Sequence, residues 1–326
     1  MASPNATFTE LVSTTWRKHR KEITDNVSKH NALLRRIKSK GNTRTEDGGL
    51  TIVEPLDYAE NNTYQRYSGY DVLNIGASDV ISAAEYAWKQ IAINVVASGL
   101  EMRQNSGDSR IINLVKARMK NAMRTFKNNF SRDLYSDGTL PNQITGLQAL
   151  VADNGQGTIG GINSATWEFW RNKVQDANTP IGGGAGAKIS KDNIEKYMLS
   201  LWIELTRGSD QPDMIVMSNE FYEFFEQSQL SIKRYTDETK ANGGFVSLKY
   251  KSCDVFFDGA SGMPPKHAYF LNTDYLKLVV HKDANLKTLE EVRPYNQDAA
   301  VIPILWQGNL TCSNRQLQGV MIDTTP

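Results

Sequence analysis

The sequence holds few of the residues that build disulfide frameworks or metal centres. Two cysteines, Cys253 and Cys312, and four histidines occur among its 326 residues. Two cysteines cannot form a framework of several disulfides, and no histidine stands at the spacing of a metal site. Neither cysteine has a histidine close to it in sequence. We therefore expect no catalytic residue, no cofactor and no bound metal.

Long hydrophobic runs are also missing. No run approaches the ~20 apolar residues that span a bilayer, and the first residues lack the apolar core of a signal peptide. We therefore expect no membrane partner and folding in a reducing cytosol. Hydrophobic residues make up 40% of the chain, charged residues 22%, and the formal net charge is +1. These values are typical of folded chains, and the length leaves room for two or three core-bearing units.

Enzyme signatures are weak. Residues 155–160 match the glycine pattern of a dinucleotide-binding turn, but no strand with an acidic residue about twenty positions further on follows them. The glycine-rich segment 182–188 lacks the Ser or Thr that would follow Lys188 in a phosphate-binding loop. No nucleophile-elbow motif occurs. The first pattern therefore predicts a tight structural turn, and a two-domain nucleotide-binding enzyme is a remote alternative.

The charge is unevenly distributed along the chain. Residues 1–40 carry a net charge of +6, which leaves −5 for the remainder. Apolar residues recur in this segment with loose helical periodicity, so we interpret residues 1–47 as a basic amphipathic arm. Such an arm suits a polyanion or an acidic partner, although a solvated helix face explains the pattern equally well. The leading basic residues of the arm are Arg17, Lys18, Arg20, Lys21, Arg35 and Arg36.

Residues 48–105 indicate an extended hairpin that follows a polar linker over 40–49. Extended segments rich in aromatic and branched residues, 51–56 and 64–73, precede a turn cluster at 74–79, and a second run, 81–96, follows it. We predict that the turn cluster is the tip. The second run also has a spacing that would suit a helix. A two-stranded ribbon is unstable alone in water, so we expect support from another subunit. Candidate residues for assembly contacts are Tyr67, Gly69, Tyr70, Gly76 and Trp88.

A long amphipathic helix is predicted over 109–134, within a region that spans 106–139. Apolar residues recur there at steps of three and four over about seven turns. The intervening positions are rich in Lys and Arg, so the helix needs an extended surface to lie against or a partner for its basic face. The predicted core of the helix contains Ile111, Val115, Met119, Phe126 and Phe130.

The remaining chain alternates predicted helices and strands. Apolar periodicity and flanking turn residues decide these assignments. The predicted helices span 164–177, 190–206 and 219–229. The predicted strands span 214–217, 245–257 (as a hairpin), 268–271, 276–280, 299–305 and 316–322.

The order of short phrases in this chain resembles the major capsid proteins of tailed bacteriophages. No phrase is a catalytic motif, so the specificity comes from their number and order over roughly residues 48–320. The phrases include DYAEN at 57–61, YSGY at 67–70, AEYAWKQ at 84–90, SGLE at 98–101, YSDGT at 135–139, ITGLQALV at 144–151, YFLNT at 269–273, NQDA at 296–299 and GNLT at 308–311.

The resemblance implies an α+β fold of the Hong Kong 97 type. It divides the chain into a basic N-terminal arm (1–47), a hairpin region with the E-loop (48–105), the spine helix of the peripheral domain (106–139), a mostly axial domain (140–265) and strands that return to the peripheral domain (266–326).

The resemblance also implies a function. It suggests a self-assembling icosahedral shell of hexamers and pentamers around double-stranded DNA, bound without sequence specificity. Portal and scaffolding proteins would be partners, and the protein would be assembled in the host bacterial cytoplasm and reside in the virion. An encapsulin-like compartment that holds a cargo enzyme is the alternative on the same fold.

One family feature is not matched by these residues. The family's type member cross-links a lysine in the hairpin to an asparagine on a neighbouring subunit. The predicted tip at 74–79 contains no lysine, and Lys89 lies well along the second predicted strand. We therefore expect no such covalent cross-link.

Overall fold

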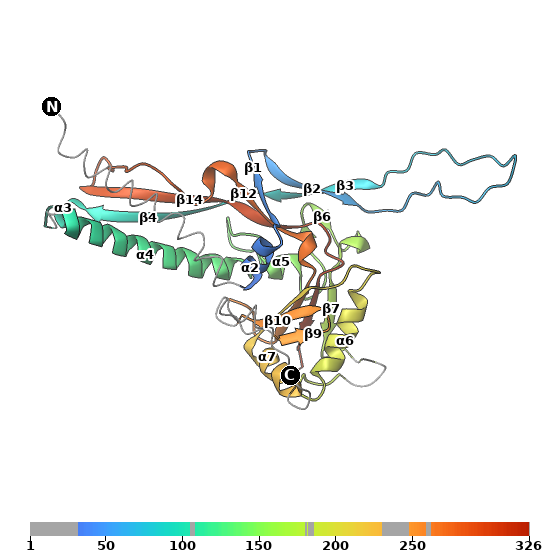
Figure 1. The fold of residues 1–326 in the computed structure, drawn as a ribbon. Coiled ribbons are helices and arrows are strands. Elements are labelled where there is room, and N and C mark those ends of the chain that lie inside the picture. Colours follow the sequence, from blue (N-terminus) through green and yellow to red (C-terminus); the bar gives the residue numbers. More distant parts are fainter. Residues whose placement is uncertain are drawn as a thin grey trace.

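The molecule has an elongated upper tier and a smaller lower tier (Figure 1). The computed structural model describes residues 32–104, 108–179, 181, 186–229, 248–258 and 262–325, without the side chains of 102–117. Each tier is built around one β-sheet, and a loop projects from the upper tier far beyond both sheets (Figure 1).

The upper sheet has five strands and depends on one long strand, β14 (Ala299–Cys312). Antiparallel to β14 run β12 along one part, and β4 and β13 along another. The β4–β14 pairing extends from Ala299 opposite Ser98 to Gly308 opposite Lys89, which makes a long ribbon. The other strands of this sheet are β1 (Thr43–Glu46), β4 (Lys89–Ser98), β12 (Leu276–His281) and β13 (Lys287–Thr288).

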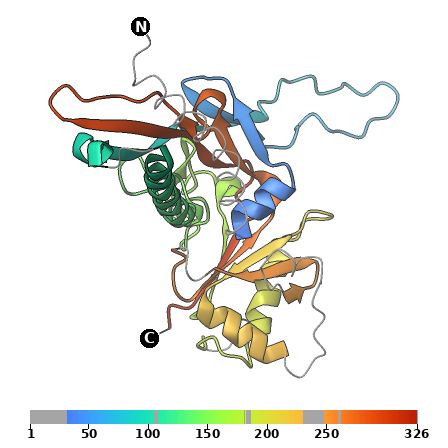
Figure 2. The ribbon, with the colours of Figure 1, turned by 60° about the vertical axis from the view of Figure 1, so that its left-hand side comes forward.

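The long helix is confirmed as α4, Asp108–Asp133, and it lies along the β4–β14 ribbon (Figures 1 and 2). Met119, Phe126 and Phe130 are buried on its sheet side. Phe126 stacks on Phe130 at 5.4 Å between ring centroids, and Phe130 meets Trp306 of β14 edge-on at 5.0 Å. The side chains of Ile111 and Val115 fall outside the described residues. A short helix, α3 (Gly99–Gln104), precedes α4.

The hairpin is present but shorter than predicted. Strands β2 (Thr51–Asp57) and β3 (Ile81–Ala87) pair antiparallel over their whole length, so the strand interpretation is confirmed over the helical one. The second predicted run, 81–96, is not one strand of this hairpin. It divides at Trp88, because the backbone after that residue pairs with β14 as β4 instead.

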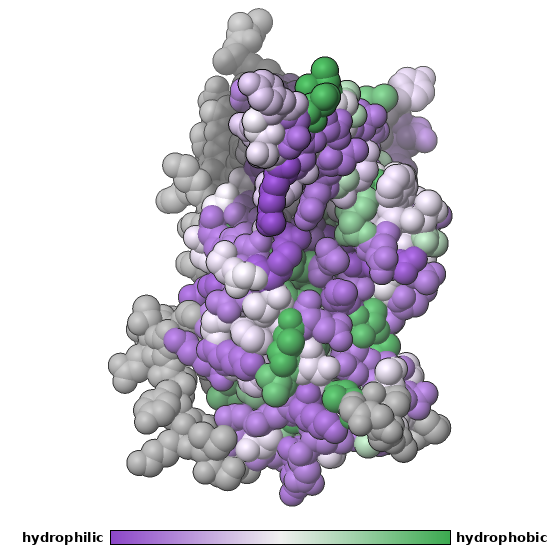
Figure 3. Space-filling view, turned by 90° about the vertical axis from the view of Figure 1, so that its right-hand side faces the viewer, coloured by the Kyte–Doolittle hydropathy of each residue, from purple (hydrophilic) through white to green (hydrophobic). Residues whose placement is uncertain are grey.

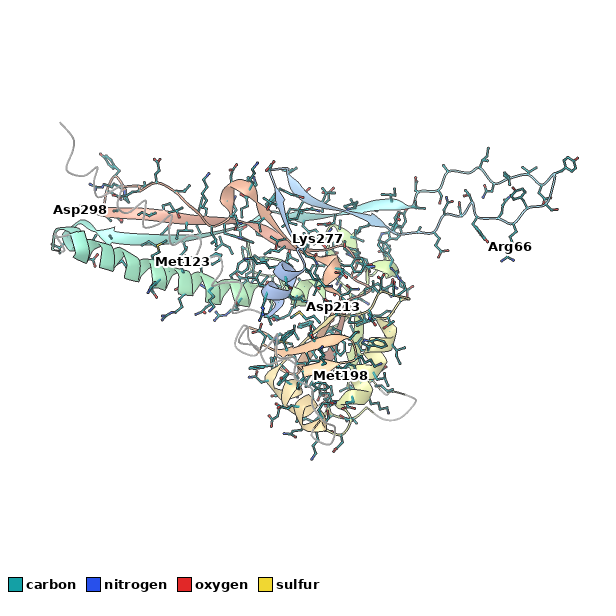
Figure 4. All side chains as sticks on the ribbon, viewed as in Figure 1. Arg66, Met123, Met198, Asp213, Lys277 and Asp298 are labelled. Carbon is teal, nitrogen blue, oxygen red and sulfur yellow. The ribbon has the colours of Figure 1, made fainter. Side chains whose placement is uncertain are left out.

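The lower sheet has six strands in the order β7-β15-β11-β8-β10-β9. Strand β8 (Met214–Met217) is buried along its whole length, as its apolar run predicts. Two helices, α6 (Ile194–Glu204) and α7 (Asn219–Ser228), pack on this sheet and confirm two predicted helices; Met198 of α6 is labelled in Figure 4. The other strands are β7 (Lys173–Asp176), β9 (Leu248–Tyr250), β10 (Cys253–Phe257), β11 (His267–Leu271) and β15 (Gly319–Ile322).

The glycine pattern at 155–160 forms the predicted tight turn. The pattern includes β5 (Thr158–Ile159), and its last glycine begins the turn to β6 (Ile162–Asn163), which pairs antiparallel with β5. Gly160 has a φ of +60°, and a Cβ there would lie 2.8 Å from Cβ of Ala84. The glycine therefore lets this turn approach β3 closely, where the Gly160 carbonyl accepts a hydrogen bond from the Glu85 amide at 2.9 Å.

The helix predicted over 164–177 is wrong. This segment contains only a 3₁₀ turn, Glu168–Trp170, before β7 pairs in parallel with β15. Burial of Trp170 fixes the turn, because its Nε1 donates to the Ile159 carbonyl at 2.9 Å. Tertiary contacts therefore override the local helical spacing.

The segment predicted as a linker, 40–49, contains β1, which pairs in parallel with β12. Helix α2 (Ala32–Ser39) precedes it.

The strands after residue 266 are divided between the two tiers. Strands β11 and β15 belong to the lower sheet, and β12, β13 and β14 belong to the upper one. Sheet membership therefore does not follow the predicted boundary at residue 265. The predicted strand 299–305 continues through the rest of β14.

Replacing Phe126 by Asp should destabilise the protein by at least about 3 kcal/mol, because it removes a buried ring and places an unpaired carboxylate in the α4 contact. Urea unfolding followed by circular dichroism measures the change. Asn128→Asp on the exposed face of the same helix is the matched control, and it should unfold near the wild-type midpoint. Equal midpoints for all three proteins would contradict burial of this stripe.

Candidate assembly surfaces

The projecting loop, residues 58–80, reaches away from the rest of its own chain (Figures 1 and 2). It contains no regular secondary structure and is held by its own hydrogen bonds. The Gln65 side chain bridges the two limbs, donating to the Val72 carbonyl at 3.0 Å and accepting from the Asn74 amide at 3.1 Å. The loop thus keeps its shape through a few polar contacts between its limbs.

The tip lies at residues 68–71 rather than at the predicted 74–79. The Asp71 amide donates to the Ser68 carbonyl at 3.1 Å, and the Ser68 amide donates to the Asp71 carboxylate at 2.8 Å. Gly69, with a φ of +51°, supplies the left-handed residue between them. Gly76 instead takes part in a local turn on the returning limb, where its amide donates to Asn74 Oδ1. Arg66 marks this end of the loop in Figure 4.

Large hydrophobic side chains on the loop are exposed. Tyr70 is fully exposed, and Val72 and Ile75 are more than 90% exposed. Seen from the side to which the loop projects, hydrophobic residues lie among hydrophilic ones (Figure 3). A soluble subunit rarely leaves such residues together in water, and contiguous patches of this kind mark interaction sites. The exposed hydrophobic residues of the loop are Tyr64, Tyr67, Tyr70, Val72, Leu73 and Ile75.

Trp88 does not belong to the projecting loop. It is half-buried in the upper tier, where its Nε1 donates to the Gly49 carbonyl at 3.0 Å and its ring meets His281 edge-on. Of the five residues predicted for assembly contacts, the fold brings Tyr67, Gly69 and Tyr70 to the tip and its flank, and places Gly76 on the returning limb.

A buried carboxylate holds the root of the hairpin. Glu54 of β2 is 1% exposed. Its Oε1 lies 3.2 Å from Arg44 Nη1 and accepts from Thr311 Oγ1 at 3.1 Å, and its Oε2 accepts from Lys277 Nζ at 3.2 Å. These partners come from β1, β14 and β12, so one side chain ties the hairpin to three strands of the upper sheet. Lys277 is labelled in Figure 4.

Other contacts fix the same root. The buried Tyr86 hydroxyl donates to the Cys312 carbonyl at 2.8 Å, and Asn309 Nδ2 donates to the Ala87 carbonyl at 3.0 Å. On the other side, the Tyr58 ring lies 5.7 Å from Trp167 and 5.8 Å from Phe169. The loop is therefore free at its tip and anchored at its base.

A second charged cluster joins the two tiers at Asp213, which precedes β8 (Figure 4). Arg36 of α2 donates to Asp213 Oδ2 through both Nε, at 3.0 Å, and Nη2, at 2.8 Å. Lys40 Nζ lies 3.0 Å from the same oxygen and 2.7 Å from Asp274. Thr273 donates its amide and its hydroxyl to the Asp213 carboxylate, each at 2.7 Å.

This cluster changes the titration of Asp213. Burial alone would raise the pKa of the carboxyl, but the hydrogen bonds from Thr273 and the cations Lys40 and Arg36 outweigh it and lower the pKa below its usual value. Because the folded protein favours the ionised form, Asp213 stabilises it near neutral pH. That contribution is lost as the pH falls through the folded-state pKa.

The structure describes only part of the predicted basic arm, from residue 32 onward. Arg36 contacts Asp213 and also lies 3.5 Å from Asp254, so it serves the junction inside this chain. Arg35 is in the same helix. The remaining predicted members, Arg17, Lys18, Arg20 and Lys21, lie outside the described residues.

Sequence reasoning missed Glu54, Asp213 and the buried cation Arg315. Arg315 is 0% exposed and donates to the Leu150 and Trp170 carbonyls and to Asn172 Oδ1. One signal existed for Glu54, because strand alternation puts it on the same face as Ile52 and Leu56, both buried. No local signal marks the other two, whose partners are distant in sequence.

The described part of the chain offers no cluster of three or more His, Cys, Asp or Glu side chains that could hold a metal ion. None of its helices is long and apolar enough to cross a membrane. Burial raises the pKa of Cys253 to about 11 and that of Cys312 to about 12. Both thiols are therefore protonated near neutral pH, unlike the thiolate of a cysteine nucleophile.

No protein-family model and no curated protein matches this sequence. Solved structures do match. The cyanophage A-1(L) capsid asymmetric unit aligns over 87% of this chain and 91% of its own, with a TM-score of 0.59 and 16% identity. The Mycobacterium phage Bobi structure aligns over 88% of this chain and 90% of its own, with a TM-score of 0.54 and 9% identity. The capsid of Myoviridae phage XM1 aligns over 88% of this chain and 91% of its own, with a TM-score of 0.53 and 11% identity.

At these identities the likeness establishes the fold. The chain has the Hong Kong 97-type fold of tailed-phage major capsid proteins, and the predicted α+β class is confirmed.

Replacing Asp213 by Asn should destabilise the protein by about 3 kcal/mol at pH 7, because Arg36 and Lys40 lose their shared carboxylate. The difference from wild type should begin to shrink below about pH 4, where the carboxyl of the unfolded chain becomes protonated, and it should be lost as the pH falls through the lower pKa of the folded protein. Urea unfolding across this pH range measures both effects. Asp79→Asn, at an exposed carboxylate of the loop, is the control, and an Asp213→Asn difference that did not vary with pH would contradict the assignment.

Proposed function

We propose that this protein is the major capsid protein of a tailed phage, which self-assembles into an icosahedral shell around double-stranded DNA. The observation that carries the proposal is the projecting loop. Its exposed hydrophobic residues find no burial within the described part of their own chain, whereas its root is rigidly anchored. A second copy of the same chain supplies that burial in a closed, symmetric shell.

The regions of the chain take matching roles in this proposal. The β2–β3 hairpin with residues 58–80 is the E-loop, α4 is the spine of the peripheral domain, and the lower tier is the axial domain that packs around the axes of pentamers and hexamers. The basic arm contributes contacts to an acidic partner or to DNA. Portal and scaffolding proteins are further partners. Assembly takes place in the host bacterial cytoplasm, and the product resides in the virion.

Electron microscopy of the purified protein, combined with a nuclease-protection assay, tests this function. Closed icosahedral shells are expected from the expressed chain, and shells from infected cells should protect double-stranded DNA. Shells that enclose a protein cargo and exclude nucleic acid would contradict the packaging role. A stable monomer under all assembly conditions would contradict the capsid function itself.

We predict that the shells contain no covalent cross-link between loops. The loop, residues 58–80, contains no lysine, and Lys89 is half-buried at the start of β4, opposite Gly308. Boiling purified shells in detergent should release a single band at the mass of the monomer. A ladder of covalent oligomers would refute this prediction.

Deleting Asn62–Ala77 should abolish closed shells and leave a folded, soluble subunit. The deletion removes the exposed hydrophobic residues but keeps the β2–β3 pairing and the hydrogen bond from the Tyr58 amide to the Val80 carbonyl. Circular dichroism should show a melt close to that of wild type, and negative-stain microscopy should show no shells.

A point variant separates the role of the tip from that of the loop's length. Tyr70→Ser should impair assembly, whereas Tyr295→Ser, which removes an equally exposed ring elsewhere in the upper tier, should not. Undisturbed shells from the deletion variant would rule out a role of the loop in assembly.

A further inference from the structure

The exposed face of α4 carries cations that have no carboxylate partners among the described residues. Lys120 and Arg124 are exposed and Lys127 is half-buried. Steps of four and three place them on one side of the helix, over about 10 Å of its axis. Arg118, further towards the start of α4, differs, because it pairs with Glu101. The α4 stripe, defined as Lys120, Arg124 and Lys127, is therefore a row of uncompensated positive charge.

The titration of Lys127 agrees with this description. Partial burial lowers the pKa of its ammonium group, and no neighbouring carboxylate opposes the change. The charged form of Lys127 is thus less favoured than that of a fully solvated lysine. An anion beside this residue would stabilise the charged form and raise the pKa again.

The neighbours of the stripe indicate which class of partner it suits. Asn121, Thr125 and Asn128 share the exposed face, and no hydrophobic side chain between 118 and 133 is exposed. Interfaces between proteins have an apolar core that is depleted of charged residues. Phosphate oxygens of DNA are instead contacted by Lys, Arg, Asn and Thr side chains. The α4 face therefore suits a phosphate backbone, in contrast to the hydrophobic loop.

The surroundings leave room for an extended partner. The opposite side of α4, with Met123, Phe126 and Phe130, packs against the β4–β14 ribbon. In Figure 4, side chains of α4 point away from that ribbon. In Figure 1, no described helix or strand covers that side of α4. A straight helix with an open, cationic side can lie along the backbone of a duplex.

We propose that Lys120, Arg124 and Lys127 of α4 form a binding stripe for the phosphate backbone of double-stranded DNA. The inference rests on the proposed capsid function, since it names the surface of the subunit that would contact packaged DNA. The stripe neutralises phosphates and releases counterions without reading sequence. Repeated copies of the stripe around a shell would multiply a weak contact.

Fluorescence anisotropy with a labelled 30-bp duplex of random sequence tests the stripe on the unassembled full chain. The variant K120Q/R124Q/K127Q should bind about tenfold or more weakly than wild type at low salt. The slope of log K against log salt should become shallower by about 2 to 3, at roughly 0.9 for each phosphate that the variant no longer neutralises. K120R/K127R keeps the charges and should retain wild-type affinity.

The matched control removes the same charge elsewhere. K188Q/K191Q/K287Q changes three exposed lysines outside α4 and should leave the affinity and the salt slope close to wild type. Equal losses in both triple variants would mean that net charge, not the stripe, governs binding, and would overturn the proposal. Unchanged DNA affinity in the α4 variant would overturn it as well.

Assembly provides an independent readout. The α4 triple variant should still melt as wild type and form shells. Loss of shells with unchanged DNA affinity would overturn the proposal and assign the stripe to an acidic segment of a neighbouring protein. Stripe-dependent DNA binding by a wild-type chain that never forms shells would support the stripe and contradict the capsid function.

Discussion

The architecture of the upper tier depends on the backbone pairing of β14. One end of this strand pairs with β12 and the other with β4 and β13, so a single extended segment joins elements that are far apart in sequence. Its alternate residues, among them Ile302, Ile304 and Trp306, are buried, and Trp306 meets Phe130 of α4. The long helix is stable because this flat, apolar ribbon lies along it.

One buried and one half-buried carboxylate hold the hairpin and α2 in place. Glu54 ties the hairpin root to three strands, and Asp213 ties α2 to the start of the lower sheet. Both carboxylates are compensated by several donors, which is the condition under which a buried charge is tolerated. Removing either carboxylate would leave its donors unpaired, so Glu54 and Asp213 are the side chains on which these two clusters depend.

The two exposed surfaces have opposite chemistry. The loop presents several exposed Tyr, Val and Ile side chains close together, whereas the exposed side of α4 presents Lys, Arg and Asn without a hydrophobic residue. A surface of the first kind gains free energy by leaving water, and a surface of the second kind by neutralising an anion. One subunit can therefore contact its copies and a polyanion through separate regions, without competition between the two.

The pattern of apolar residues along the sequence was enough to predict those helices and strands that bury one continuous stripe or run of apolar side chains. The spacing of apolar residues predicted α4 within one residue at each end, and four consecutive apolar residues predicted β8. Only the tertiary structure decided β1, β7 and the end of the hairpin at Ala87, because each depends on a partner strand that is distant in sequence. The partners of the half-buried Asp213 and the buried place of Arg315 could not be predicted from the sequence either. A charged residue is expected at the surface until the fold brings donors or acceptors from other segments within hydrogen-bonding distance, and that proximity is a property of the whole chain.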